Sequence, residues 1–147
     1  MITENQPGTT TRVELYEMLD LIDKSDDVKE TVRKFGNQYS SFNDYLRCVF
    51  DDRVEFLLPE GKPPYRPAPP AAVPSTWHKK HMDLKYFVKI GVTDGMSQIK
   101  REMKFIEVLE SVHPEDALIL CEMIKKKTTS KKLTEEVAKE ALPKLFE

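Results

Sequence analysis

A proline-rich stretch in the middle of the chain limits the possible folds more than any other feature of the sequence. Seven of the ten prolines lie between Pro59 and Pro74, in the string LPEGKPPYRPAPPAAVP. Proline has no backbone N–H and holds φ near about −65°, so this string is typical of extended or polyproline-like chain and not of helix. The sequence therefore places an irregular segment over about residues 58–76.

Both flanks of this segment have the 3–4 apolar spacing of helices. Candidate start signals are Thr11, Ser25, Trp77, Ser97, Pro114 and Thr134, and another apolar stripe runs from Phe42 to Phe50. We expect Gly36 to end the second helix, residues 91–95 to form a turn, and Pro143 to stop the last helix. No alternating strand pattern or Asn-Gly hairpin is present. The predicted fold class is all-α, with about six to seven helices.

The proline-rich segment has two interpretations. As a linker it would join two domains, but flanks of about 58 and 73 residues make cores that are marginal alone. We therefore predict one compact domain over residues 11–147 after a flexible N-terminus at 1–10. The segment then crosses the surface as a strap that covers the core with Val54, Phe56, Leu57, Leu58 and Tyr65. The alternative is that Tyr65 and Arg66 are presented to an aromatic groove on a partner.

Apolar positions of the predicted helices are the candidate core. The helix at 97–112 has Ile99, Met103, Ile106 and Leu109 on one face. The stripe of the next helix is Ala117, Leu118, Leu120, Cys121 and Ile124. Because Cys48 and Cys121 fall on such stripes, we interpret both as small core residues and not as nucleophiles.

The net charge of −2 hides a strong division along the chain. Residues 1–60 hold seven basic and thirteen acidic side chains, whereas residues 61–147 hold sixteen and twelve. The balances are −6 and +4, so a basic face is compatible with a near-neutral total. No apolar run is long enough for a membrane span and the start has no signal-peptide pattern, so we expect a cytoplasmic protein without membrane contact.

The sharpest local feature is the string KKKTTSKK at 125–132, which has five lysines and three hydroxyl side chains between two predicted helices. One interpretation is a solvated loop whose lysines offset a helix dipole. The other is contact with phosphate oxygens, helped by the helix N-terminus at Thr134. The residues assigned to this contact are Lys125, Lys126, Lys127, Ser130, Lys131 and Lys132. Additional basic surface would come from Lys79, Lys80, Lys100, Arg101 and Lys104.

Signatures of enzymes are missing from the sequence. It has no GxSxG, GxxxxGK[ST], HExxH or GxGxxG string. Asp94-Gly95 matches the end of a nucleotidyltransferase K-x-D-G motif, but Val92 stands where the lysine nucleophile belongs. His78 and His81, at i and i+3, would suit a metal, yet no third ligand is suggested nearby and a solvated helix start is the simpler interpretation. We expect no catalytic residues, no cofactor and no metal.

Several strings resemble those of a known family. FDDRVEFLLPEGKPPYRP, FIEVLESVHPEDALILCEMIKKK and LTEEVAKEALPKLF resemble a family of small tailed-phage proteins, common in T-even-like and marine phages, over most of residues 13–146. That family has no established activity. The resemblance implies a phage protein that works in the cytoplasm of an infected bacterium.

A remoter similarity is to the helical DNA-binding domain of phage-type ATP-dependent DNA ligases. Residues 15–58, ending in FNDYLRCVFDDRVEFLL, are similar to the opening of that domain. Its far end is similar too, with a helix over 116–127, a basic loop over 128–132, a short helix over 133–141 and then Leu142, Pro143 and Leu145. In the ligases the basic loop touches the duplex backbone across the minor groove, and the resemblance passes this role to the lysines and Ser130 of 125–132. The sequence has no counterpart of the adenylation and OB parts, so we do not expect ligation.

The leading hypothesis is a non-catalytic phage accessory protein that binds duplex DNA through the 125–132 loop. The alternative is a protein-interaction module, either a virion component or a protein that binds a host factor, which uses the proline-rich segment and the acidic N-terminal face.

Overall fold

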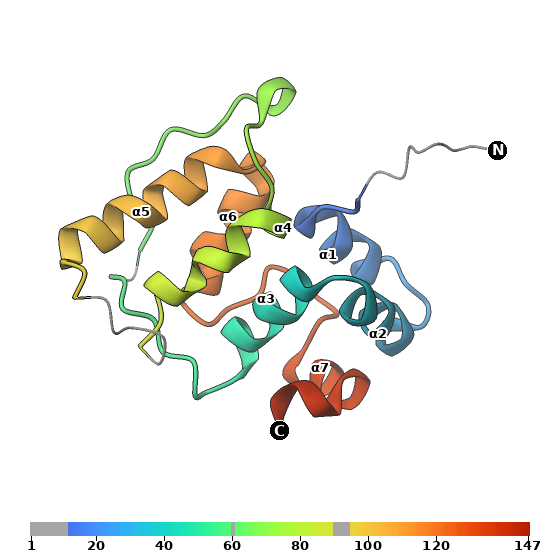
Figure 1. Cartoon of the computed structure of the whole chain (residues 1–147). Coiled ribbons are helices and arrows are strands. Elements are labelled where there is room, and N and C mark those ends of the chain that lie inside the picture. Colours follow the sequence, from blue (N-terminus) through green and yellow to red (C-terminus); the bar gives the residue numbers. More distant parts are fainter. Residues whose placement is uncertain (1–11, 60, 90–94) are drawn as a thin grey trace.

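Seven α-helices and three short 3₁₀ helices are present in the computed structural model, which describes residues 12–59, 61–89 and 95–147 (Figure 1). In chain order they are α1 (Leu15–Asp23), α2 (Val28–Gln38), α3 (Ser40–Phe50), η1 (Pro70–Ala72), α4 (Trp77–Lys80), η2 (His81–Tyr86), α5 (Gln98–Ser111), α6 (Pro114–Met123), α7 (Glu135–Ala141) and η3 (Pro143–Phe146). These ranges contain no β-strand, only an isolated bridge between Phe56 and Val88. The all-α prediction is confirmed. The expected flexible N-terminus and most of the expected turn at 91–95 lie outside the described residues.

Besides α4, which begins at Trp77 as expected, three predicted helix starts are confirmed by the residues at their first turn. The side chain of Ser97 accepts a hydrogen bond from the backbone N–H of Lys100, and that of Thr134 accepts one from Val137. Pro114 occupies the first turn of α6, where its missing N–H has no intrahelical partner to lose. Because a side-chain cap or a proline acts within one turn of chain, these starts were visible in the sequence.

The prediction for α2 was wrong at both ends. Asp27, and not Ser25, caps it by accepting from the N–H of Glu30, while the hydroxyl of Ser25 accepts from the N–H of Asp27 and caps that turn instead. At the other end the helix continues through Gly36 to Gln38. Gly36 is there for close packing, since a Cβ at this position would collide with the side chain of Leu142. It therefore brings α2 against the C-terminal end of α7.

The single helix expected from Trp77 to Val88 is a one-turn α-helix followed by a 3₁₀ helix. His81 and Phe87 are buried and Leu84 is half-buried, at a spacing of three residues. A 3₁₀ helix has three residues per turn, so residues spaced by three lie on one side of it and face the core together. In an α-helix the same residues would point in different directions around the helix axis. Trp77 anchors the segment on α3 by donating from its indole N–H to the carbonyl of Ser41, at 2.9 Å.

One core unites the two flanks of the proline-rich segment. α1, α2 and α3 from the first flank and α5, α6 and α7 from the second contribute buried apolar side chains to the same cluster. Val54, Phe56, Leu58 and Tyr65 pack against this cluster, and Ala68 is buried. The predicted packing of the strap is therefore confirmed for these residues, whereas Leu57 is half-buried and does not belong to the cluster, and Pro70–Ala72 within the segment form the 3₁₀ helix η1. No helix in the described part of the chain is long and apolar enough to cross a membrane.

The expected core faces of α5 and α6 need correction. Ile99 and Met103 are 74% and 59% exposed, whereas Phe105, Val108 and Leu109 are buried. Apolar residues lie around most of α5, so spacing alone allowed either face. The edge-to-face contact between Phe105 and Phe87, with centroids 5.4 Å apart, belongs to the face that is buried. In α6, Leu118 is 49% exposed while Leu120 is fully buried.

We predict that Leu120→Ala lowers the free energy of unfolding by about 2–5 kcal/mol, because it leaves a cavity between α6 and the rest of the core. The matched change Leu118→Ala in the same helix removes an exposed side chain, and its effect is expected within about 0.5 kcal/mol. Urea unfolding followed by circular dichroism measures both. Equal losses would mean that the orientation of α6 is not the one described.

Candidate nucleic-acid interface

The lysine-rich loop of 125–132 begins as the C-terminal cap of α6. The N–H of Lys127 donates to the carbonyl of Glu122 and the N–H of Lys126 to that of Met123, which is the pairing of a Schellman motif. Such a cap needs one residue in the left-handed region, and here it is Lys126, with φ of 62°. Glycine is usual at this position, and a side chain costs about 1–2 kcal/mol. The loop therefore starts with a fixed and strained turn.

The side chain of Lys126 turns inward and holds the loop on the end of α3. Its ammonium group donates to the carbonyls of Asp51 and Val54, both at 2.8 Å. Burial lowers the pKa of this lysine, and the nearby carboxylates of Asp51 and Asp52 oppose that effect. Lys126 is thus bound to protein oxygens and is a structural part of the loop.

The second half of the loop is wrapped around the carboxylate of Asp23, the last residue of α1. One oxygen of Asp23 accepts from the hydroxyl of Ser130 at 2.6 Å and from the N–H groups of Lys131 and Lys132 at 3.0 Å. Burial pushes the pKa of Asp23 up, but these hydrogen bonds outweigh it and leave the pKa below its usual value. The backbone donors that would suit a phosphate oxygen are therefore occupied by a carboxylate.

The helix start after the loop is also unsuited to an anion. The hydroxyl of Thr134 is used in capping α7, and the first turn of α7 carries Glu135 and Glu136. Two carboxylates there oppose a phosphate that approaches the same helix end. The N-terminus of α7 is therefore not arranged to help bind phosphate oxygens, contrary to the expectation from the sequence.

Exposed ammonium groups are what the loop offers to a ligand. Within the described residues, the exposed side chains of Lys127 and Lys131 make no hydrogen bond or ion pair. Lys132 donates to the carbonyl of Ser25 at 3.1 Å, and Lys125 pairs with Glu122 at 2.9 Å. The loop therefore splits into a part that builds it, Lys126 and Ser130, and a part that faces solvent, centred on Lys127 and Lys131.

The additional basic residues of the sequence prediction lie on α4 and α5. Arg101 is buried and donates to the carbonyls of Tyr86 and Met96, at 2.6 and 2.9 Å, so it ties η2 to the start of α5. The ammonium group of Lys104 lies 4.8 Å from the ring centre of Tyr86. Lys79 and Lys100 are exposed, and Lys80 is half-buried. In Figure 1 the first turn of α5 lies well apart from the first turn of α7, which follows the 125–132 loop.

His78 and His81 point to protein partners and not to a common ligand. The two ring nitrogens of His78 bond the hydroxyl of Ser41 and the carbonyl of Val13, both at 2.8 Å. His81 pairs with Asp44 at 2.6 Å. The described residues contain no group of three or more His, Cys, Asp or Glu that would hold a metal ion. Both imidazoles therefore fasten the α4–η2 segment to its neighbours.

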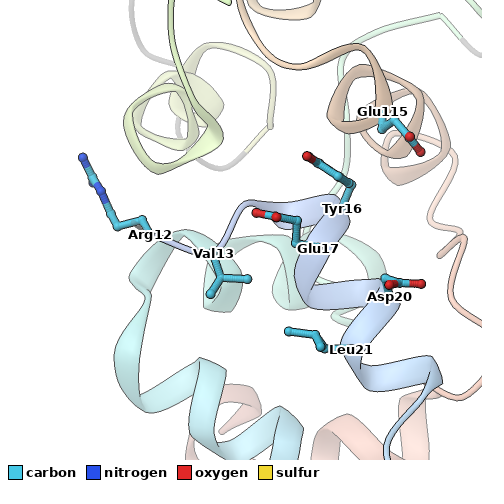
Figure 2. A pocket seen from close by; sticks show the side chains of 7 residues that line it. All are labelled: Arg12, Val13, Tyr16, Glu17, Asp20, Leu21 and Glu115. Atoms are coloured by element: carbon cyan, nitrogen blue, oxygen red, sulfur yellow. The ribbon is translucent and has the colours of Figure 1, made fainter. Parts of the chain in front are cut away.

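An acidic groove lies beside α1. The net charge of this half of the chain predicts an acidic face but does not say which residues form it. Figure 2 shows Tyr16, Glu17, Asp20 and Leu21 along α1, with Glu115 opposite them at the start of α6. Together with Arg12 and Val13 they line a pocket of about 600 Å³. The lining combines three carboxylates with the guanidinium of Arg12 and with apolar side chains, so its surplus of negative charge suits basic groups.

A buried carboxyl supports this groove from beneath. Asp116 is fully buried, and one of its oxygens accepts from the N–H of Tyr16 at 2.8 Å while the other has no partner. Burial raises the pKa of Asp116 to about 7, and the negative charges of Glu14, Glu17 and Glu115 add to that effect. The link between α1 and α6 is thus a carboxyl group that titrates near neutral pH.

Sequence reasoning missed Asp23 and Asp116, for the same reason. Asp23 meets its partners across 107 to 109 residues and Asp116 across 100. Neither lies in a motif, and no local spacing connects an aspartate to a donor so far along the chain. Only the folded chain brings half-buried Asp23 to its donors and buries the side chain of Asp116.

The fold and its surfaces define a small helical domain with a basic interhelical loop and an acidic groove. By sequence the chain belongs to DUF6433, a family of unknown function, and the match covers residues 18–131. No curated protein and no solved structure shows a significant match.

We predict that stability falls as the pH rises from about 4 to about 7 because of Asp116. Unfolded aspartate ionises near pH 4, whereas the pKa of Asp116 in the fold is about 7. In this window the unfolded chain binds fewer protons, so the free energy of unfolding declines by up to about 1.4 kcal/mol per pH unit. Asp116→Asn removes this dependence and keeps an oxygen for the N–H of Tyr16.

The measurement is the difference in unfolding free energy between Asp116→Asn and the wild type, taken at several pH values. As the pH rises to about 7, the unfolding free energy of the variant is expected to increase relative to that of the wild type. Above about pH 7 the difference is expected to stay constant. Asp20→Asn, an exposed change on the same groove, serves as the control for the loss of one negative charge there. A difference for Asp116→Asn that does not change with pH would contradict the assignment.

Proposed function

We propose that the protein is a non-catalytic DNA-binding accessory protein of a tailed phage. It contacts backbone phosphates of duplex DNA through the exposed lysines of the 125–132 loop. The observation that carries the proposal is the pair Lys127 and Lys131, which stand free on a loop that Lys126 and Asp23 hold in place. A fixed loop presents its charges without an ordering cost at each binding event.

The order of elements around the loop supports this proposal. α6, the basic loop, the short helix α7 and Leu142-Pro143 follow one another in the order of the ligase DNA-binding domain to which the sequence is similar. The resemblance to tailed-phage proteins supplies the setting, which is the cytoplasm of an infected bacterium. The proposed role is an accessory one in replication, repair or packaging.

The geometry refines how the loop would meet DNA. Since Asp23 fills the backbone donors and Lys126 is turned inward, the contact is made by side-chain ammonium groups, chiefly those of Lys127 and Lys131 with Lys125 and Lys132 beside them. Lysines on phosphates carry no sequence information and release counterions. The binding is therefore non-specific, weak for a single copy and strongly dependent on salt.

The acidic groove favours a second function, that of a protein-interaction module. Its three carboxylates and the apolar side chains of Tyr16 and Leu21 suit a partner segment that carries both basic and apolar residues. The proline-rich strap is less suited as a ligand for an aromatic groove, because Tyr65 packs on the core and only Arg66 of the Tyr65-Arg66 pair is exposed. A phage or host protein would bind on the acidic side while the loop remains free for DNA.

The DNA proposal predicts that Lys127→Ala with Lys131→Ala weakens binding to any duplex by about tenfold or more. It also lowers the slope of log affinity against log salt by about one for each lysine. Fluorescence anisotropy with a labelled duplex and with its nicked form, from low to moderate salt, measures both quantities.

The matched control is Lys34→Ala with Lys144→Ala, which removes the same charge from exposed positions on α2 and η3. It is expected to leave the salt slope unchanged. No binding of the wild type at low salt, or an equal loss in both double variants, would rule out the loop as the DNA contact.

The groove proposal predicts a partner that survives nuclease treatment. Glu17→Gln, Asp20→Asn and Glu115→Gln together remove the charge of the groove with little change in shape. A protein recovered from nuclease-treated extract of infected cells by the wild type should be lost with this triple variant and retained with the Lys127 and Lys131 variant. If no protein is recovered once the extract has been treated with nuclease, the groove proposal is contradicted and only the DNA proposal remains.

A further inference from the structure

The outward face of α5 carries an apolar stripe. Ile99, Met103 and Ile106 recur at i, i+4 and i+7, which places them along one side of the helix. Ile99 and Met103 are 74% and 59% exposed, and Ile106 is half-buried. Single exposed apolar residues are ordinary on protein surfaces, but neighbouring ones aligned along one helix mark a contact surface.

Two opposite charges flank this stripe at matching distances from its centre. Lys100 follows the first isoleucine and Glu107 follows the last, three residues before Met103 and four after it. Seven residues are about two turns, so both side chains lie on the same flank of the stripe. Among the described residues, neither side chain has a hydrogen bond or an ion pair within its own chain.

We infer that α5 is a dimer interface, on which α5 of a second copy packs antiparallel about a two-fold axis near Met103. The axis brings the Met103 side chains of the two copies together and sets Ile99 of each copy opposite Ile106 of the other. It also places each Lys100 beside the partner's Glu107. A two-fold interface must be self-complementary in this way, with apolar groups at the centre and opposite charges on either side.

The charge pattern selects a second copy in antiparallel orientation over the other arrangements. A parallel pairing would set Lys100 against Lys100 and Glu107 against Glu107, which is repulsive. The flank opposite the charges adds a recess for the partner. A pocket of about 190 Å³ between α5 and the strap is lined in part by Leu58, Pro63, Phe105 and Ile106, and the partner's Ile99 lies next to it.

The small area of the contact between the two α5 helices limits the affinity of the dimer. α5 has fourteen residues and is therefore about 21 Å long, so the contact of two such helices lies at the lower end of specific interfaces. We expect a reversible dimer with a dissociation constant in the micromolar range, about 1–100 µM. The dimer does not depend on the DNA proposal, but it would present two 125–132 loops in one assembly.

Sedimentation velocity of the full chain, without DNA and over about 1–200 µM, tests the inference in the range expected for a small interface. The wild type should change from monomer to dimer across this range. Met103→Glu places two carboxylates at the axis and should keep the protein monomeric. Lys100→Glu alone should raise the dissociation constant at least about tenfold.

The double variant Lys100→Glu with Glu107→Lys is the sharpest test, because it reverses both charges and should restore the dimer. Met82→Glu and Leu118→Glu change apolar residues of similar exposure on other elements and should leave it intact. Circular dichroism checks that each variant is folded. A wild type that is monomeric at the highest concentration, or a dimer unaffected by Met103→Glu, would overturn the inference.

Discussion

The packing of the helices before the proline-rich segment against those after it is the contact on which the rest of the structure depends. Neither flank has enough apolar surface for a separate core, so each completes the other. Two aspartates of α1 and α6 fasten the joint, Asp23 on the loop after α6 and Asp116 on the backbone of Tyr16. The strap closes over the same core, which makes the irregular segment part of the domain and not a hinge.

This joint also decides what the basic loop can do. Asp23 takes its backbone donors and Lys126 is consumed in holding it on α3, so the loop has less phosphate-binding capacity than its five lysines suggest. What it keeps is two exposed ammonium groups, those of Lys127 and Lys131, on a backbone that Lys126 and Asp23 hold in place. A string of like charges in a sequence is thus only an upper bound on the charge that a surface offers.

The three proposed contact surfaces lie on different elements of one domain. The loop follows α6, the acidic groove lies between α1 and the start of α6, and the apolar stripe is on α5. Because these surfaces do not overlap, the proposed contacts with nucleic acid, with a basic partner segment and with a second copy would not compete. Such a division would suit the accessory role proposed for the protein.

The sequence by itself determined the elements that depend on a few neighbouring residues. Helix starts at Ser97, Pro114 and Thr134, the largely irregular strap and the all-α class all follow from proline chemistry, capping and apolar spacing. The tertiary structure alone decided which face of α5 is buried, since Phe87 had to be in place to receive Phe105. It also decided that His81–Tyr86 wind as a 3₁₀ helix, that Arg101 is buried, and that the lysine loop wraps around Asp23. Local propensity acts over a turn or two of chain, whereas these choices rest on contacts between residues far apart in sequence, which exist only once the core has formed.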